Sequence, residues 1–182
     1  MALLTLAEAK AQLDIDTLSD DVQLQLYIEA LTPVIEGYIG PVEARTVTET
    51  VQGAGITLAL LHAPVLSVAS LTPVLSGGTA VDVNLLHVDG PSGVLSYTTG
   101  AAFQGGPWTA TYTAGRAAIP ATVKLASLLL LQHLWSTRYG AARGVSRTTD
   151  YDVTEPMPGF GYAVPNRVIE LLRPLMQPPG IA

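Results

Sequence analysis

The chain has 182 residues, a length typical of one domain with its own hydrophobic core. Its residues are 48% hydrophobic and only 13% charged, so we expect a large core or apolar surface that neighbouring subunits cover. Cysteine is absent, which excludes disulfides and thiolate metal sites. The first residues lack the basic start of a secretory signal, so we expect synthesis in a cytosol-like compartment.

The net charge of −6 is unevenly distributed along the chain. Residues 1–55 hold nine acidic residues against two basic ones, whereas the remainder holds six against seven. Such asymmetry can orient neighbouring subunits head to tail, although a solvated acidic face explains it equally well. Tight binding of duplex DNA is not expected, because it requires a concentrated basic surface. The segment 116–147 has no acidic residue and five basic ones: Arg116, Lys124, Arg138, Arg143 and Arg147.

Two helices are predicted in the first forty residues. Thr5 and Glu8 have the spacing of a capping box, which predicts a short helix that ends near Leu13. Ser19 is a suitable N-cap, and the two aspartates after it favour a helix N-terminus. Apolar residues then recur at helical spacing up to about Ile39, so we expect a second, longer helix there.

The middle of the chain changes to a period of two, which is typical of strands. The Gly53–Gly55 turn predicts a hairpin between the first two strands, and Asp89–Gly93 is a strong turn signal between two later ones. About six short strands with local connections predict an antiparallel sheet. The expected strands are Arg45–Gln52, Ile56–Leu61, Val65–Thr72, Val81–Val88, Val94–Thr98 and Trp108–Thr113.

A long helix is predicted directly after the last strand. Pro120 fits its first position and Gly140 fits a left-handed C-terminal cap, which leaves about 19 residues, or roughly 28 Å. The middle of this segment is apolar almost all round, so we expect a central helix that is buried on several sides. The apolar run is too short for a bilayer, and no membrane association is expected.

The C-terminal part is predicted to contain a long loop and one more helix. The segment 140–164 is rich in Gly, Thr and Pro and has no stable period. Pro165 then opens a helix to about Leu172, within a C-terminal helix and tail at 165–182. We therefore expect a single α+β domain over residues 1–182: about four helices, one of them long, central and buried, with an antiparallel unit of about six short strands.

The loop at 140–164 is the predicted interface with a partner or a neighbouring subunit. Aromatic and Met side chains are enriched in tight interfaces, and opposite charges on adjoining subunits can fix their register. The apolar candidates are Tyr151, Met157, Phe160 and Tyr162, and the charged ones are Arg143, Arg147, Asp150 and Asp152. The alternatives are a polar mobile loop and a clamp onto the chain's own helix. Arg138, Arg143 and Arg147 are also candidates for contact with DNA or an acidic partner, although exposed arginines are usually only solvated.

No catalytic, cofactor-binding or metal-binding residue is predicted. The three histidines share no metal-ligand spacing, and no serine lies in a nucleophile elbow. Asp150, Asp152 and Glu155 could form a divalent-ion site, but a polar loop explains them better. We therefore predict neither a cofactor nor an enzymatic activity.

Three regions resemble the phage head–tail connector (adaptor) family of the HK97 type. The first is a strand ending in TYTAG, followed by IP, VKLASLLLLQHLW and TRYG. The second is the N-terminal pair LTLAEAKAQL and IEGYIG, and the third is VPNRVIELLRP near the C-terminal end. Each motif is a hydrophobic pattern with a few fixed Gly and Pro residues, and their order along the chain carries the resemblance.

This resemblance implies a structural virion protein that is made in the host cytoplasm and lies in the neck of a tailed bacteriophage, at the head–tail interface. Members of the family form an oligomeric ring, a dodecamer, below the portal protein and around the DNA channel. The implied partners are further copies of the chain, the portal, and a stopper or tail-completion protein. Double-stranded DNA would pass through the channel without sequence-specific binding.

Two alternatives remain open at this point. One is another neck ring protein, such as a head-completion stopper, which the order of attachment in the particle would distinguish. The other is a small enzyme with an unrecognised site. A deep pocket that holds His62 or His87 beside a carboxylate would favour the enzyme.

Overall fold

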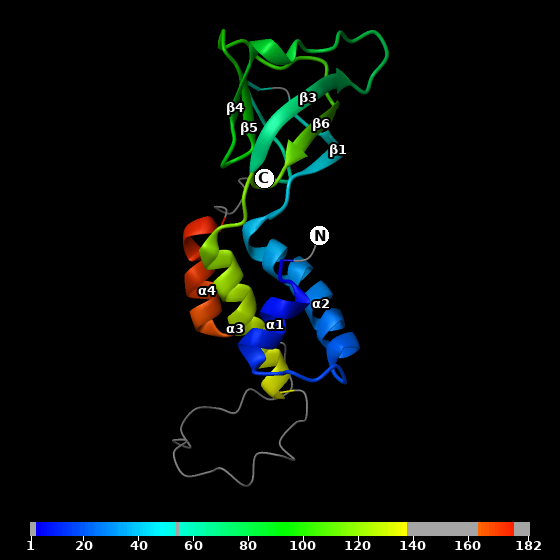
Figure 1. The fold of residues 1–182 in the computed structure, drawn as a ribbon. Helices are drawn as coiled ribbons and strands as arrows, with labels where there is room; N and C mark the ends of the chain where they lie inside the picture. The colour runs from blue at the N-terminus through cyan, green and yellow to red at the C-terminus, as the bar shows by residue number, and fades with distance from the viewer. Residues whose placement is uncertain (1–2, 54, 138–163, 177–182) are drawn as a thin grey trace. The chain divides into compact units, whose positions relative to one another are not determined.

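The computed structural model describes residues 3–53, 55–137 and 164–176, which divide into two compact units. The helical unit comprises the described residues up to 35 together with those from 120 to 174, and the β unit comprises residues 36–119 with 175–176 (Figure 1). The expectation of a single domain stays a prediction. The combination of helices with antiparallel sheets confirms the predicted α+β class.

The described residues form four α-helices, at the places where the sequence predicted helices. They are α1 (Leu6–Leu13), α2 (Asp21–Ile39), α3 (Ala121–Thr137) and α4 (Asn166–Leu172), with 3₁₀ turns at η1 (Val83–Leu85) and η3 (Arg173–Leu175). The capping box of α1 is confirmed: the Glu8 N–H donates to Thr5 Oγ1 over 3.2 Å, and the Thr5 N–H donates to Glu8 Oε2 over 2.8 Å. Among the described residues, no helix is long and apolar enough to span a membrane.

Helix α1 is tied by ion pairs to the helices on both sides of it. Lys10 Nζ lies 2.6 Å from Asp21 Oδ1 at the start of α2, and Lys124 Nζ on α3 lies 2.7 Å from Glu8 Oε1. The Lys124 ammonium, with the Thr5 N–H and hydroxyl, lowers the pKa of the Glu8 carboxyl to about 2. These contacts fix α1 against α3, while fully buried leucines and isoleucines of α2 fill the core: Leu24, Ile28, Leu31 and Ile35.

Helix α3 is the long buried helix that the sequence predicted. Within one copy of the chain its fully buried residues lie on one face, and burial on several sides, some of them by neighbouring subunits, stays a prediction. Its buried residues recur every three or four positions, at Val123, Ala126, Ser127, Leu130 and Leu131. The Ser127 hydroxyl donates to the Val123 carbonyl over 2.8 Å, so the one polar group in this stripe is satisfied. Leu125 is 47% exposed. The sequence of an apolar helix thus shows which residues can be buried, but the packing of neighbouring elements decides which residues are buried.

The β unit contains two antiparallel three-stranded sheets, in the orders β1-β6-β3 and β2-β5-β4. The β4–β5 hairpin around Asp89–Gly93 was predicted and is confirmed. The predicted hairpin between the first two strands is wrong, because β1 pairs with β6 and β2 pairs with β5. The strands are β1 (Arg45–Val51), β2 (Thr57–Ala59), β3 (Val65–Pro73), β4 (Leu86–Asp89), β5 (Val94–Tyr97) and β6 (Trp108–Ala114).

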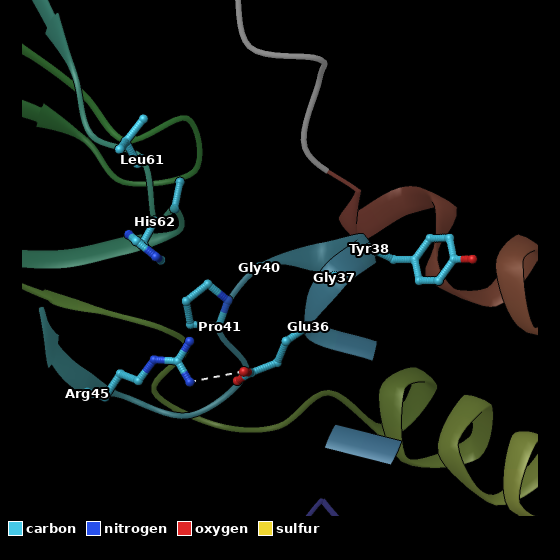
Figure 2. Close-up of a pocket in the computed structure, with 9 residues that line it drawn as sticks. Glu36, Gly37, Tyr38, Gly40, Pro41, Arg45, Leu61 and His62 are labelled. Atoms are coloured by element: carbon cyan, nitrogen blue, oxygen red, sulfur yellow. Dashed lines mark hydrogen bonds and ion pairs between the residues drawn. The ribbon is translucent and has the colours of Figure 1, made fainter. Parts of the chain in front are cut away.

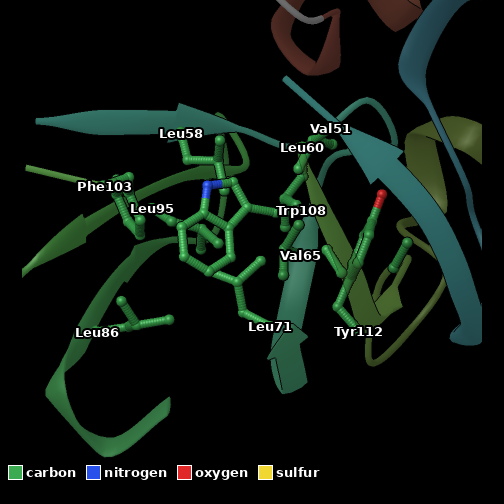
Figure 3. Packing of buried hydrophobic residues seen from close by; sticks show 12 residues of the cluster. Val51, Leu58, Leu60, Val65, Leu71, Leu86, Leu95, Phe103, Trp108 and Tyr112 are labelled. Atoms are coloured by element: carbon green, nitrogen blue, oxygen red, sulfur yellow. The ribbon is translucent and has the colours of Figure 1, made fainter. Parts of the chain in front are cut away.

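Strand β6 organises the core of the β unit. Alternate residues of this strand, Trp108, Ala110, Tyr112 and Ala114, are buried, and the threonines between them are not. The Trp108 ring meets the Phe103 ring edge to face, with centroids 6.3 Å apart. In Figure 3 the Trp108 ring lies among the aliphatic side chains of the cluster. Because β6 pairs with both β1 and β3, this single buried strand holds the first sheet together.

Candidate functional site

Every residue predicted to form an interface or to contact DNA lies outside the described residues. The structure therefore does not test these assignments, which remain predictions: Arg138, Arg143, Arg147, Asp150, Tyr151, Asp152, Met157, Phe160 and Tyr162. The proposed divalent-ion group of Asp150, Asp152 and Glu155 lies outside as well. Within the described part of the chain, no group of three His, Asp or Glu side chains could hold a metal ion.

A hollow of about 350 Å³ lies where the chain passes from the end of α2 to β1 (Figure 2). The Glu36 carboxylate in this hollow has two partners. It accepts a hydrogen bond from the Val42 N–H over 3.0 Å and forms an ion pair with Arg45, also at 3.0 Å. Both carboxylate oxygens are thereby engaged in fixing the connection to β1. The lining residues are Glu36, Gly37, Tyr38, Gly40, Pro41, Arg45, Leu61, His62 and Ala63.

His62, at the rim of this hollow, contacts a carboxylate on β1. Its Nδ1 lies 2.9 Å from Glu49 Oε2, while Glu49 Oε1 accepts the Tyr112 hydroxyl at 2.9 Å and the Leu61 N–H at 2.8 Å. The Tyr112 hydroxyl in turn accepts the His62 N–H over 3.1 Å. Burial, together with the Glu49 carboxylate, raises the pKa of the Tyr112 hydroxyl.

This Glu49 cluster contains a histidine beside a carboxylate, as the enzyme alternative requires. Its hydrogen bonds, however, serve to hold parts of the fold together. The Glu49 carboxylate accepts three donors, and two of them come from the loop that precedes β3. The bonds of Leu61 and of the His62 ring join that loop to β1, and the His62 N–H joins it to Tyr112 on β6. The Tyr112 hydroxyl in turn joins β6 to β1, so the cluster fixes the loop on the sheet. Sequence reasoning missed Glu49, since its role depends on Tyr112, a residue 63 positions away.

Two basic residues of the segment 116–147, Arg116 and Lys124, are bound by groups of their own chain. The Arg116 guanidinium donates to the Ile39 and Pro41 carbonyls, each over 3.0 Å, and so caps the C-terminal end of α2. Burial lowers its pKa. Lys124 is paired with Glu8, as described above. The described part of segment 116–147 is thus not a free basic surface, which corrects the picture given by charge counting.

One face of the β1-β6-β3 sheet carries hydroxyl side chains in register across all three strands. Thr48 and Thr111 lie directly opposite each other, with their hydroxyl oxygens 3.1 Å apart. This face is polar and uncharged, so it can be hydrated without attracting phosphate groups. Its members are Thr46, Thr48, Thr50, Ser67, Ser70, Thr72, Thr109, Thr111 and Thr113.

Comparison with known proteins decides the family. A family model described as head completion protein matches residues 2–161, which is most of the chain. The chain belongs to the head completion protein family. Membership confirms the resemblance to the phage connector proteins and a role in head completion. No curated protein matches the chain.

Solved structures share the fold of this head completion protein at low sequence identity. A chain in the neck of an empty gene transfer agent particle, computed with C6 symmetry, has a TM-score of 0.63 and 21% identity, covering 99% of this chain and 92% of that one. A chain in the native neck, computed with C12 symmetry, gives 0.64 and 22%, covering 97% and 90%. A chain from the native virion gives 0.61 and 21%, covering 99% and 92%.

Proposed function

We propose that this head completion protein is an adaptor that forms a ring below the portal and links it to the next neck or tail component. The match to the family model over residues 2–161 carries the proposal. The similar chains in gene transfer agent necks support it, because their assemblies were computed with C6 and C12 symmetry, as expected for rings. A dodecamer is the copy number that best fits this similarity.

The role of the ring toward DNA is passive in this proposal. Of the six Lys and Arg side chains in the described residues, four are bound within their own chain: Lys10, Arg45, Arg116 and Lys124. In the described part of the chain, Arg167 and Arg173 remain to hold phosphates, and an overall acidic ring lets duplex DNA slide through its channel. We expect weak, sequence-independent binding to free duplex DNA that fades as salt rises. Nanomolar, sequence-specific binding in a fluorescence anisotropy titration at physiological salt would contradict this role.

The segment 140–164 is, in the same proposal, the part that becomes ordered on the portal or on the next subunit. Ordering a segment requires roughly 1–2 kcal/mol per residue in backbone entropy, which only a partner surface can offset. Tyr151, Met157, Phe160 and Tyr162 supply the anchors for such a surface. Limited proteolysis should cut the free protein within 140–164 and spare the same bonds in assembled particles. Equal cleavage in both states would show that the segment is only a linker.

A second candidate is a head-completion stopper, because the family description, head completion protein, fits either neck ring. The two functions differ in their direct partner. Light scattering of the purified chain, alone and with portal, separates them: an adaptor forms a ring on the portal alone, whereas a stopper needs another ring first. A stable dimer that ignores the portal would contradict both. We expect no catalytic activity, in keeping with the bonding of the Glu49 cluster.

A further inference from the structure

Helix α2 has two apolar faces, and only one of them is covered. Its buried face fills the core of the helical unit, as described above. On the other side, apolar residues follow one another at intervals of four, and Val22 is 87% exposed and Leu26 66% exposed. We call this the α2 ridge: Leu18, just before the helix, then Val22, Leu26, Ala30 and Val34. Exposed apolar rows of this length mark interaction surfaces in soluble proteins.

Helix α3 carries a second, shorter row with the same spacing, the α3 ridge, formed by Ala121, Leu125 and Leu129. Ala121 is exposed, Leu125 is 47% exposed and Leu129 is half-buried. In the helical unit, α3 and α4 lie on one side of α1 and α2 lies on the other (Figure 1). Rows with a spacing of four are the ridges that interdigitate in the commonest class of helix packing.

The charges around the two ridges are opposite. Helix α2 contains three acidic residues and no basic one. Asp21 and Glu36 are paired with basic side chains of the same chain, so the acidic group beside the ridge is the exposed Glu29, next to Ala30. On helix α3 the basic residue Lys124 is paired with Glu8. The exposed charged residues of α4 and η3 are Arg167, Glu170 and Arg173, which leaves an excess of one positive charge there. Complementary charges beside an apolar row favour one pairing and one orientation of the two helices.

We infer that the α2 ridge docks on the α3 ridge of a second copy of the chain, and that this contact closes the ring. The inference rests on the proposed ring function. A cyclic ring with more than two copies needs a heterologous interface, in which two different surfaces of each subunit meet. The helical unit presents two such surfaces, equal in residue spacing and opposite in the sign of the surrounding charge.

The absence of cysteine allows a direct test by cross-linking. A full-length Leu26→Cys variant and a full-length Leu125→Cys variant are mixed, added to portal and treated with a flexible bis-maleimide. The mixture should give covalent dimers, and each variant alone should stay monomeric. The double variant Leu26→Cys/Leu125→Cys should give a ladder that ends at the closed ring. Leu85, on η1, is 47% exposed like Leu125, so Leu26→Cys mixed with Leu85→Cys is the matched control and should give no dimer.

Three results would overturn the inference. Dimers formed by Leu26→Cys alone would show an isologous contact between two α2 ridges. Rings that assemble normally but give no link between positions 26 and 125 would place the ring contact elsewhere, while the adaptor function stands. A wild-type chain that never enters a neck ring would remove the proposed function, and with it the basis of this inference.

Discussion

Leu26 and Leu31 lie five residues apart on α2, and replacing each by alanine should separate folding from assembly. Leu31 is fully buried, so Leu31→Ala removes packed core atoms and leaves a cavity. Such changes lower the free energy of unfolding by about 2–5 kcal/mol. Leu26 is 66% exposed, so Leu26→Ala should change the free energy of unfolding by no more than about 0.5 kcal/mol.

During assembly the order of the two effects should be reversed: Leu26→Ala should weaken the contact between subunits, and Leu31→Ala, which changes no exposed residue of the ridge, should not. If Leu26 is buried between subunits, losing its three outer carbon atoms weakens each contact by roughly 2 kcal/mol, at about 0.8 kcal/mol per buried carbon. That corresponds to roughly a 30-fold lower association constant. Urea unfolding followed by helical circular dichroism measures the first effect, and sedimentation velocity with portal measures the second. A Leu26→Ala chain as unstable as Leu31→Ala, or a Leu31→Ala chain as stable as wild type, would refute this assignment of the two faces.

Three further predictions concern single contacts. The pKa of the Glu8 carboxyl is lowered from 4.5 to about 2 in the folded chain, so its contribution to stability is present above pH 4.5 and is lost as pH falls toward 2. Acid titration followed by helical circular dichroism should show this loss of stability in wild type. The loss should be smaller in the Glu8→Gln variant. Gly115 has φ of +119°, and an added Cβ would overlap the backbone carbonyl of Glu43, so Gly115→Ala should lower the melting temperature markedly. Gly55→Ala, where an added Cβ meets nothing, is the matched control and should melt like wild type. Glu49→Gln should destabilise the β unit by about 1–3 kcal/mol in urea unfolding, because the His62 and Tyr112 groups lose their charged acceptor; an unchanged midpoint would contradict the locking role.

Local features were predictable from the sequence because their partners are near in the chain. The capping box of Thr5 and Glu8 spans three residues, and the turn of the β4–β5 hairpin spans five. Both are determined by backbone geometry and short-range hydrogen bonds. The end of α4 near Leu172 was predictable for the same reason, since an apolar stripe follows Pro165 directly.

Long-range pairing was not predictable, because a period of two is the same whichever strand is the partner. Strand β1 has the alternation needed for pairing with β2, yet it pairs with β6, which is more than fifty residues away. The ion pair between Glu8 and Lys124 was not predictable from the sequence either, since the two residues are 116 positions apart. The α2 ridge was overlooked for a related reason: periodicity found the buried leucines of α2, and the second apolar row became visible only once exposure was known.

A reconstruction of the particle neck tests the central claim most directly. The account predicts a closed ring of this chain in direct contact with the portal, with the α2 ridge of each subunit against α3 of the next and DNA in the central channel. A ring separated from the portal by another protein, or a neck that lacks this chain, would contradict the adaptor function.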